Sequence, residues 1–504
     1  MSADCKALRA LSGSSVRSRL VACLVVVGGA LAACLGAAGV AAAGLPPEDE
    51  CPLLGGIPGG APSEDAVPTL VREGTMLGFS DLLLLRGLLP DEVWRNRDQF
   101  FHDGMRMLIG PCHRRYPAPR FYDHATQEFA GRSTIDRHGN LSGYVAGLPF
   151  PPDRIDPEAG DAGVRWAWNL EHRYRGAGPS GRFRIVDLPG RRGGEQRYEG
   201  TFFFAQTSHR ADLPETGYAL PGSEDTLWVA GGRFLKPFNA RHLAWRQVRP
   251  ASVQERYSEP DDTFVYVPSL RKVRRSATSW VDGMFTPRYR VSGDTVGAGT
   301  MPAGDPLGGG TLGPVNPAAA GAVHVTENLR RGFVGLSLRP NAYAWKLHGF
   351  REVLAPINSA RSGYPAHADR NFGASGLSVG SDRWDVRYAV LLEGASRERG
   401  SEYNAIFLYV DYQTQQPLYV ITKRGRGLLV DVGILVHRFS GDVADYPDWP
   451  GKEKAYVFDP VLASFYAGGD GSGWRRESYD VKSTPLEASE IRRYLSSDYL
   501  ARGR

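Results

Sequence analysis

Alternating apolar and polar residues recur along most of the chain after residue 180. The clearest example is residues 261–267, where Thr263, Val265 and Val267 fall on one face of an extended chain and Phe264 and Tyr266 on the other. A period of two in β-branched and aromatic residues predicts a strand. Similar patterns predict strands at residues 182–188, 198–207, 226–235, 241–248, 386–393, 405–411, 418–422, 428–439 and 456–458, with another near residue 343 and one or two more within 281–291.

Helical spacing is confined to three stretches. Residues 90–108 and 161–174 carry apolar residues three and four positions apart, and residues 489–500 predict a short terminal helix. Many antiparallel strands with few helices favour a mainly β (α+β) fold. We expect a large curved antiparallel sheet, or half-open β-barrel, that closes around an apolar interior.

These patterns divide the chain into four parts. We expect an N-terminal export segment (1–43), a mixed, helix-containing region (44–180), a β domain (181–485) and a C-terminal helix (486–504). Residues 293–321, within the β domain, are rich in Gly, Pro and Ala and predict a long loop.

The first 43 residues resemble a secretory signal. Basic residues precede an apolar run that begins at Leu20, and Ala41 to Ala43 fit a small-residue cleavage site before Gly44. Residues 31–34 also fit a bacterial lipobox, with acylation at Cys34. An uncleaved anchor is the third alternative, because the apolar run is long enough to span a bilayer. All three place the protein in the envelope, in the periplasm or at the outer membrane.

Composition narrows the class of partner. The chain has 61 Gly, 35 Pro and 10 Trp, typical of a turn-rich, aromatic-rich β protein, and a formal net charge of +5. Four basic residues and Asp4 give residues 1–43 a charge of +3, which leaves +2 for the rest of the chain. That balance argues against binding to nucleic acid.

Two cysteines remain outside the export segment. Cys51 and Cys112 form an even pair in an exported chain, which predicts a disulfide. The alternatives are two free thiols, or pairing with another chain.

Three motifs carry a resemblance to a known family. Residues 266–275 read Tyr-Val-Pro-Ser-Leu-Arg-Lys-Val-Arg-Arg, residues 343–358 begin Tyr-Ala-Trp, and residues 383–394 are followed by Tyr-Val-Asp at 409–411. They resemble the bacterial family of unknown function DUF1329, which is similar in fold to the lipoprotein carriers LolA and LolB. The resemblance spans roughly residues 181–466.

The resemblance implies a carrier or chaperone of a lipid or lipidated ligand, with helices on the concave side of a half-barrel and no covalent chemistry. It also implies a membrane exporter of the resistance-nodulation-division type as a partner. In the first motif Arg271, Lys272, Arg274 and Arg275 form a basic ridge. Such a ridge is usually a solvated face, and contact with lipid phosphate at a membrane surface is the alternative.

Motifs for covalent or cofactor chemistry are weak. Ser378 lies in a Gly-x-Ser-x-Gly pattern, but no strand precedes it and no helix follows it, as a nucleophile elbow requires. Residues 308–313 match a dinucleotide fingerprint, yet prolines follow where a helix should begin. His113, Asp123 and His124 fit no zinc template. We expect no enzyme activity, no cofactor and no metal.

Aromatic side chains on the predicted strands are the candidate ligand contacts. If the sheet is a half-barrel, some of them should line its cavity, although register cannot be set from one sequence. The candidates are Trp228, Phe234, Trp245, Tyr266, Phe285, Tyr289 and Trp345. An outer-membrane scaffold held by a lipid at Cys34, and a serine hydrolase using Ser378, are the alternative functions.

Overall fold

The structure is a computed structural model. It describes residues 45–54, 69–70, 72–188, 194–276, 280–291, 323–326, 336–361, 363, 370–398, 402–451, 453–468 and 473–502. The export segment, Cys34 and the whole of the predicted loop 293–321 lie outside these residues. Residues 42–504 form one compact unit. No helix within the described ranges is long and apolar enough to cross a membrane.

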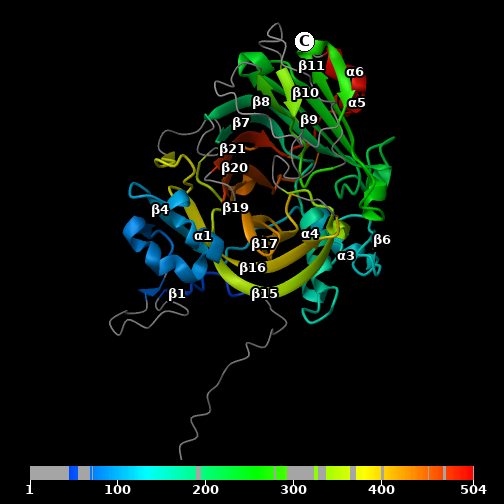
Figure 1. The fold of residues 1–504 in the computed structure, drawn as a ribbon. Coiled ribbons are helices and arrows are strands. Elements are labelled where there is room, and N and C mark those ends of the chain that lie inside the picture. The colour runs from blue at the N-terminus through cyan, green and yellow to red at the C-terminus, as the bar shows by residue number, and fades with distance from the viewer. Residues whose placement is uncertain are drawn as a thin grey trace, which may run out of the picture. The chain divides into compact units, whose positions relative to one another are not determined.

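Strands dominate the described chain (Figure 1). They are β1 (Leu53–Leu54), β2 (Thr69–Leu70), β3 (Met76–Leu77), β4 (Met107–Cys112), β5 (Thr134–Ile135), β6 (Leu141–Ser142), β7 (Ser180–Leu188), β8 (Gln196–Gln206), β9 (Thr226–Lys236), β10 (Ala244–Pro250), β11 (Asp262–Val267), β12 (Lys272–Arg275), β13 (Arg288–Val291), β14 (Val323–Thr326), β15 (Tyr343–Ala355), β16 (Arg383–Ser396), β17 (Ala405–Asp411), β18 (Pro417–Arg424), β19 (Leu428–Phe439), β20 (Phe458–Ala467) and β21 (Gly473–Lys482).

Helices are short. They are α1 (Asp91–Arg95), α2 (Arg97–Phe100), α3 (Arg120–Glu128), α4 (Ala162–Glu171), α5 (Ala488–Leu495) and α6 (Ser497–Arg502), with a 3-10 helix η1 (Phe79–Leu88) near the N-terminus. Two sequence predictions need correction. The helix expected over 90–108 ends at Phe100, and the expected terminal helix is interrupted at Ser496.

One sheet organises the molecule. Fifteen strands pair in the order β12-β11-β10-β9-β8-β7-β21-β20-β19-β18-β17-β16-β4-β3, with β15 also paired to β16. Most of the pairs named here are antiparallel, whereas β4 pairs with β16 in parallel. The mainly β class with a large unclosed sheet is therefore confirmed. Because β3 and β4 join the sheet, the N-terminal region shares it with the later strands.

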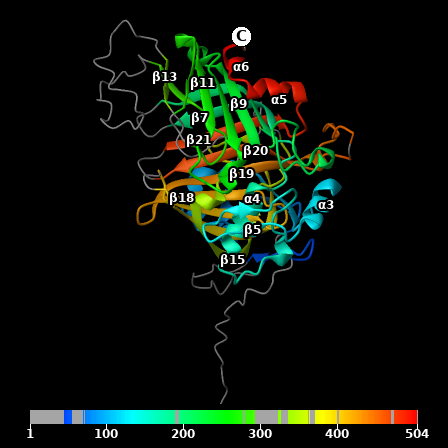
Figure 2. The same ribbon diagram turned by 90° about the vertical axis from the view of Figure 1, so that its right-hand side faces the viewer.

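Both faces of the sheet are covered. On the face that we call inner, α4 packs against β15 and β16, and residues 280–287 cover β7–β11. On the outer face, α5 packs against β9, and the N-terminal layer from β3 to β4 covers β16–β20. Figure 2 shows α5 and α6 beside β9 and β11, and α4 beside β15. Double coverage explains why β19 is buried almost continuously rather than at alternate positions.

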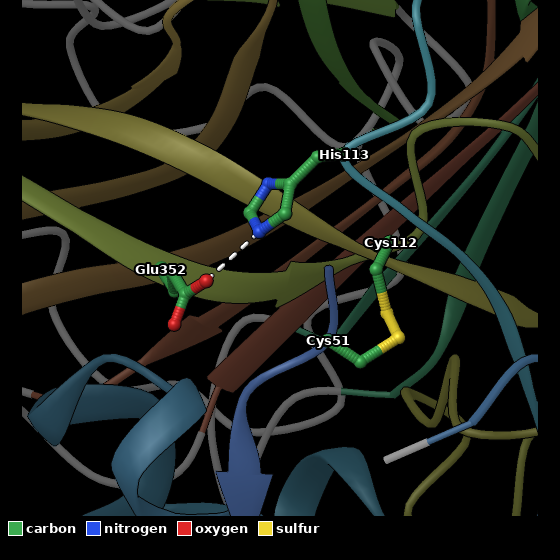
Figure 3. The surroundings of a disulfide bond; sticks show 4 residues. All are labelled: Cys51, Cys112, His113 and Glu352. Carbon is green, nitrogen blue, oxygen red and sulfur yellow. Dashed lines mark hydrogen bonds and ion pairs between the residues drawn. A yellow bond between two sulfur atoms is a disulfide. The ribbon is translucent and has the colours of Figure 1, made fainter. Parts of the chain in front are cut away.

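The disulfide predicted from the sequence is present in the structure. The sulfurs of Cys51 and Cys112 are 2.05 Å apart, and this bond joins the N-terminal segment to the last residue of β4 (Figure 3). The next residue, His113, is buried, and its Nε2 lies 2.8 Å from Oε1 of Glu352 on β15. The N-terminal layer is thus fastened beside the parallel β4–β16 pair.

Candidate functional site: a cleft on the inner face

An aromatic core covers the inner face of β7–β11. Phe183, Phe234 and Trp245 come from three of these strands and are each at most 1% exposed. Their rings pack in pairs, with centroids 5.3–6.2 Å apart. Trp245 lies opposite Gly232 of β9, where an added Cβ would come within 2.5 Å of the indole. Glycine at that position is therefore what allows the indole to lie flat on the sheet.

A loop segment completes this core. We call residues 280–287 the covering segment, because Val281, Met284 and Phe285 insert from it between the strand aromatics and are each at most 1% exposed. Its backbone is held by the sheet, since the Phe285 N–H donates to Oε1 of Gln247 at 2.7 Å. Arg249 Nη2 donates to the carbonyl of Val281 at 2.9 Å. Two polar side chains of β10 therefore fasten the segment over the apolar core.

A buried ion cluster supports these two side chains. Asp261 accepts from Gln247 at 2.7 Å, from Arg249 at 3.0 and 3.1 Å, and from Arg339 at 2.6 Å. The ionised side chains of Asp261, Arg249 and Arg339 are 0% exposed. Burial lowers the pKa of Arg339 to about 10. Two arginines surround one carboxylate in this cluster. Removing one of the three side chains therefore leaves buried charge without its partner.

The cluster links the covering segment to residues 336–342, which also pack on the inner face. Arg249 Nη1 donates to the carbonyl of Ser337 at 2.9 Å, in addition to its bond with Val281. The Ser337 hydroxyl donates in turn to Oε1 of Glu171, the last residue of α4, at 2.8 Å. Burial raises the pKa of Glu171. Arg249 thus connects the covering segment to residues 336–342 and, through Ser337, to α4.

A cleft opens at the end of β7–β9 beside the covering segment. The cleft is narrow, with a cavity volume of about 20 Å³ behind an open mouth, and its lining is mainly apolar with Asp187 and Arg475 among the lining residues. Thr286 is 4% exposed, and its Oγ1 has no hydrogen-bond partner within the described part of the chain. The remaining lining residues are Ile185, Tyr198, Phe234 and Pro287. An apolar cleft with a few polar groups is the general form of a small-molecule site.

The structure brings together four of the seven aromatic candidates. Trp228, Phe234, Trp245 and Phe285 belong to the inner-face core, and of these Phe234 also lines the cleft. They contact one another, so they fill the inner face rather than surround an empty one. The cleft borders this core, with Phe234 belonging to both.

The other three candidates lie elsewhere. Tyr266 is half-buried on the opposite face of β11, because its neighbours Val265 and Val267 take the inner positions. Trp345 packs against the α4 cluster, and its Nε1 donates to the carbonyl of Pro340 at 2.7 Å. Tyr289 lies on β13, and its side chain is outside what the structure describes.

The basic ridge lies at one edge of the sheet. Arg271 caps the turn after β11 with a φ of 51°, and Lys272, Arg274 and Arg275 are exposed on the edge strand β12. Arg275 lies 3.9 Å from Asp262. Cationic side chains on an edge strand discourage sheet-to-sheet association, which is the simplest account of the ridge.

The residues weighed for covalent and metal chemistry are placed as follows. Ser378 is 1% exposed, and its hydroxyl accepts the Gly380 N–H at 3.3 Å. His113 is engaged with Glu352, and His124 lies 3.6 Å from Glu128 on α3. Over the described ranges, no three His, Cys, Asp or Glu side chains gather as a metal site would require.

The ion cluster was missed from the sequence. Asp261 and Asp262 look like turn residues in the sequence, but Asp262 is the first residue of β11 and Asp261 is buried beside it. A signal was present in β10, where Gln247 and Arg249 lie two and four positions after Trp245 and so face the same inner side of the sheet. Polar residues at core positions of a strand indicate a buried network.

Comparisons with known proteins agree with the sequence motifs. A family model described as "Protein of unknown function (DUF1329)" matches residues 98–295. The resemblance to DUF1329 is confirmed. The matched stretch includes the Tyr266–Arg275 motif and ends before the two later motifs. No curated protein matches the chain.

Solved structures show similarity at low identity. A DUF1329 family protein from Desulfovibrio piger is 12% identical, with 68% of this chain and 99% of that chain covered and a TM-score of 0.36. An outer membrane lipoprotein-sorting protein domain from Vibrio parahaemolyticus is 12% identical, with 68% of this chain and 100% of that chain covered and a TM-score of 0.35. A LolA superfamily protein from Nitrosomonas europaea is 12% identical, with 66% of this chain and 94% of that chain covered and a TM-score of 0.29. None of these three descriptions mentions an exporter.

Proposed function

We propose that the protein binds an apolar ligand, such as a lipid acyl chain, in the inner-face cleft and carries it without covalent chemistry. The observation that supports this most is that a loop, and not only strands, supplies side chains to the inner-face core. Met284 and Phe285 fill the inner face from a loop, whereas most of their partners come from strands. A loop can move away while the strand hydrogen bonds stay intact, so these two side chains can give up their place to a ligand.

The energetics suit reversible binding. Burying one CH₂ contributes about 0.8 kcal/mol, so a chain of about 14 carbons supplies roughly 10 kcal/mol before the costs of association. Displacing Met284 and Phe285 offsets part of that gain, since burial of each contributes about 1.5–3 kcal/mol. A carrier must release what it binds, and such an exchange of one apolar group for another keeps the net affinity moderate.

The polar groups around the core set how easily the segment opens. Moving the covering segment breaks the Phe285–Gln247 and Val281–Arg249 hydrogen bonds described above. Each contributes about 0.5–1.5 kcal/mol, and more where a charged group donates. Asp261 stays behind to satisfy Gln247 and Arg249. Asp282, also in the covering segment and 1% exposed, accepts from the hydroxyl groups of Tyr343 and Tyr403, so its carboxylate keeps its partners only if the movement is confined to residues 284–287.

The finer parts of this function belong to the same proposal. The carrier works in the cell envelope, between membranes, after export directed by residues 1–43 or while anchored by a lipid at Cys34. A membrane exporter of the resistance-nodulation-division type is its partner. These points are supported by the sequence of the export segment and by the family resemblance, and the cleft itself bears only on the ligand.

Truncation of the covering segment tests the ligand proposal. Phe285→Ala should enlarge the cleft and strengthen uptake of a fluorescent fatty-acid probe several-fold over the wild type. Phe439→Ala is the matched control, because Phe439 is 2% exposed in the separate outer-face core. Both changes should cost about 3–5 kcal/mol of stability, but only the first should increase uptake.

A milder variant and a second measurement complete the test. Phe285→Leu provides the comparison if Phe285→Ala does not fold. Native mass spectrometry of wild-type protein isolated from its own envelope should show retained lipid. If neither the wild type nor a folded Phe285 variant takes up the probe, and no lipid is retained, the carrier proposal is wrong and a scaffold remains.

A further inference from the structure

Two neighbouring turns at one end of the sheet expose apolar side chains to solvent. Phe238, in the turn between β9 and β10, is 82% exposed, and Leu235 at the end of β9 is 39% exposed. Leu270, in the turn between β11 and β12, is 45% exposed. Ala244 of β10 pairs with Tyr266 of β11, which sets the two turns next to each other. Three large apolar side chains therefore gather at one sheet end.

Cations surround these apolar groups. The two turns, residues 236–243 and 268–272, contain the exposed Lys236, Arg241, Arg271 and Lys272 and no Asp or Glu. Glu199 on β8 is paired with Lys236 at 3.1 Å and with Arg184 at 2.7 Å, and Asp262 lies 3.9 Å from Arg275. Arg274 and Arg275 extend the positive surface along β12.

The opposite end of the same strands has the opposite charge. Apart from the buried Arg210, Asp212 and Asp261, the β8–β9 and β10–β11 connections, residues 207–225 and 251–261, contain five acidic residues and one basic residue. The strands between these two ends therefore separate a cationic, apolar end from an acidic one. A negatively charged surface would attract the first end and repel the second, which fixes an orientation.

We propose that the end formed by residues 235–243 and 268–275 docks on an anionic phospholipid surface. Exposed aromatic and aliphatic groups ringed by Lys and Arg are what the boundary between headgroups and acyl chains accepts, since the apolar groups enter it and the cations meet lipid phosphate. Phe238 is the principal inserting side chain. An acidic protein would match the cations but would leave the 82% exposed ring without an apolar environment.

The position of the cleft gives this docking a use. Phe234 lines the cleft, and its backbone pairs with His242 and Leu243 across the same hairpin whose turn carries Phe238. The cleft and the docking end thus share one end of β9. In this respect the inference extends the proposed carrier function, because a ligand would pass between membrane and cleft over a short path. The docking itself does not require that a ligand binds.

Vesicle binding tests the inference directly. The full-length chain should bind phosphatidylglycerol vesicles more tightly than phosphatidylcholine vesicles, and added salt should weaken the difference. Phe238→Ser should weaken binding at least about tenfold, and Arg271→Gln with Lys272→Gln about fivefold for each cation. Leu83→Ser is the matched control, since Leu83 is 65% exposed on η1 in the N-terminal layer, and it should leave binding unchanged.

Hydrogen exchange separates this surface from any contribution of the apolar N-terminus. With phosphatidylglycerol vesicles, amides in residues 236–243 and 268–272 should become protected, while those in 207–225 and 251–261 should not. Equal protection at both ends, equal protection by phosphatidylcholine, or equal vesicle binding by the Phe238 and Leu83 variants would overturn the proposal. Fatty-acid uptake in the absence of vesicles reports on the cleft alone, so failure of docking and failure of the carrier function are distinguishable.

Discussion

Removing the charge of Asp261 is the sharpest test of how the inner face is held together. Asp261→Asn keeps the shape of the side chain and removes the only negative charge that contacts both Arg249 and Arg339 in the described structure. Both guanidinium groups are 0% exposed. Water cannot replace the lost carboxylate without opening the core, so the two positive charges remain buried with only the longer-range attraction of Asp282 and Glu171.

The expected loss follows from that burial. Breaking a buried ion pair by removing one partner typically costs about 3–5 kcal/mol. Here one change affects two arginines at 2.6–3.1 Å and the hydrogen bond from Gln247 at 2.7 Å, so the upper part of that range applies. Because total stability is usually about 5–15 kcal/mol, the variant should lose a large fraction of it.

The neighbouring residue supplies the control. The Asp262 side chain is 46% exposed and pairs with Arg246 at 2.7 Å, so Asp262→Asn should cost about 1 kcal/mol or less. Urea denaturation at neutral pH measures both variants against the wild type, and the slopes must agree for the comparison to hold. If Asp261→Asn loses no more stability than Asp262→Asn, the ion cluster does not stabilise the inner face.

Two further predictions concern stability. Replacing Cys51 and Cys112 together by Ser should lower the free energy of unfolding by about 4 kcal/mol, because the bond closes a loop with a sequence separation of 61; an unchanged urea midpoint would contradict this. Burial raises the pKa of Asp459 to about 7, so stability from this group is present below pH 4 and is lost as pH rises to 7. Asp459→Asn should therefore gain on the wild type by up to about 4 kcal/mol between pH 4 and pH 8, and parallel pH curves for the two proteins would refute the shift.

Local pattern predicted the strands better than the helices. Residues 182–188, 198–207 and 226–235 were placed to within about two residues, because period-two alternation persists where one face is buried. The helix predicted over 90–108 included Met107 and Leu108, yet these residues begin β4, and β16 supplies backbone partners to that strand. That pairing joins segments more than 270 positions apart, and no local signal reports it.

The candidate site was only partly accessible from the sequence. The aromatic strand residues were identified, but their register was not, and so Tyr266 was grouped with side chains that face the other way. The buried role of Asp261 depends on Arg339, which reaches it from a distant segment. Burial of a charge is a tertiary property, whereas its sequence neighbours suggest only a turn.

The parallel contact between β4 and β16 has a consequence for how the chain must fold. The N-terminal layer emerges first from the ribosome, but the strand against which it pairs is synthesised hundreds of residues later. The same delay applies to β7, whose partner β21 lies close to the C-terminus. Contacts of such high sequence separation form slowly. During that wait the apolar faces of the early segments stay uncovered, so we expect the nascent chain to need holding chaperones for longer than a protein built from local hairpins would.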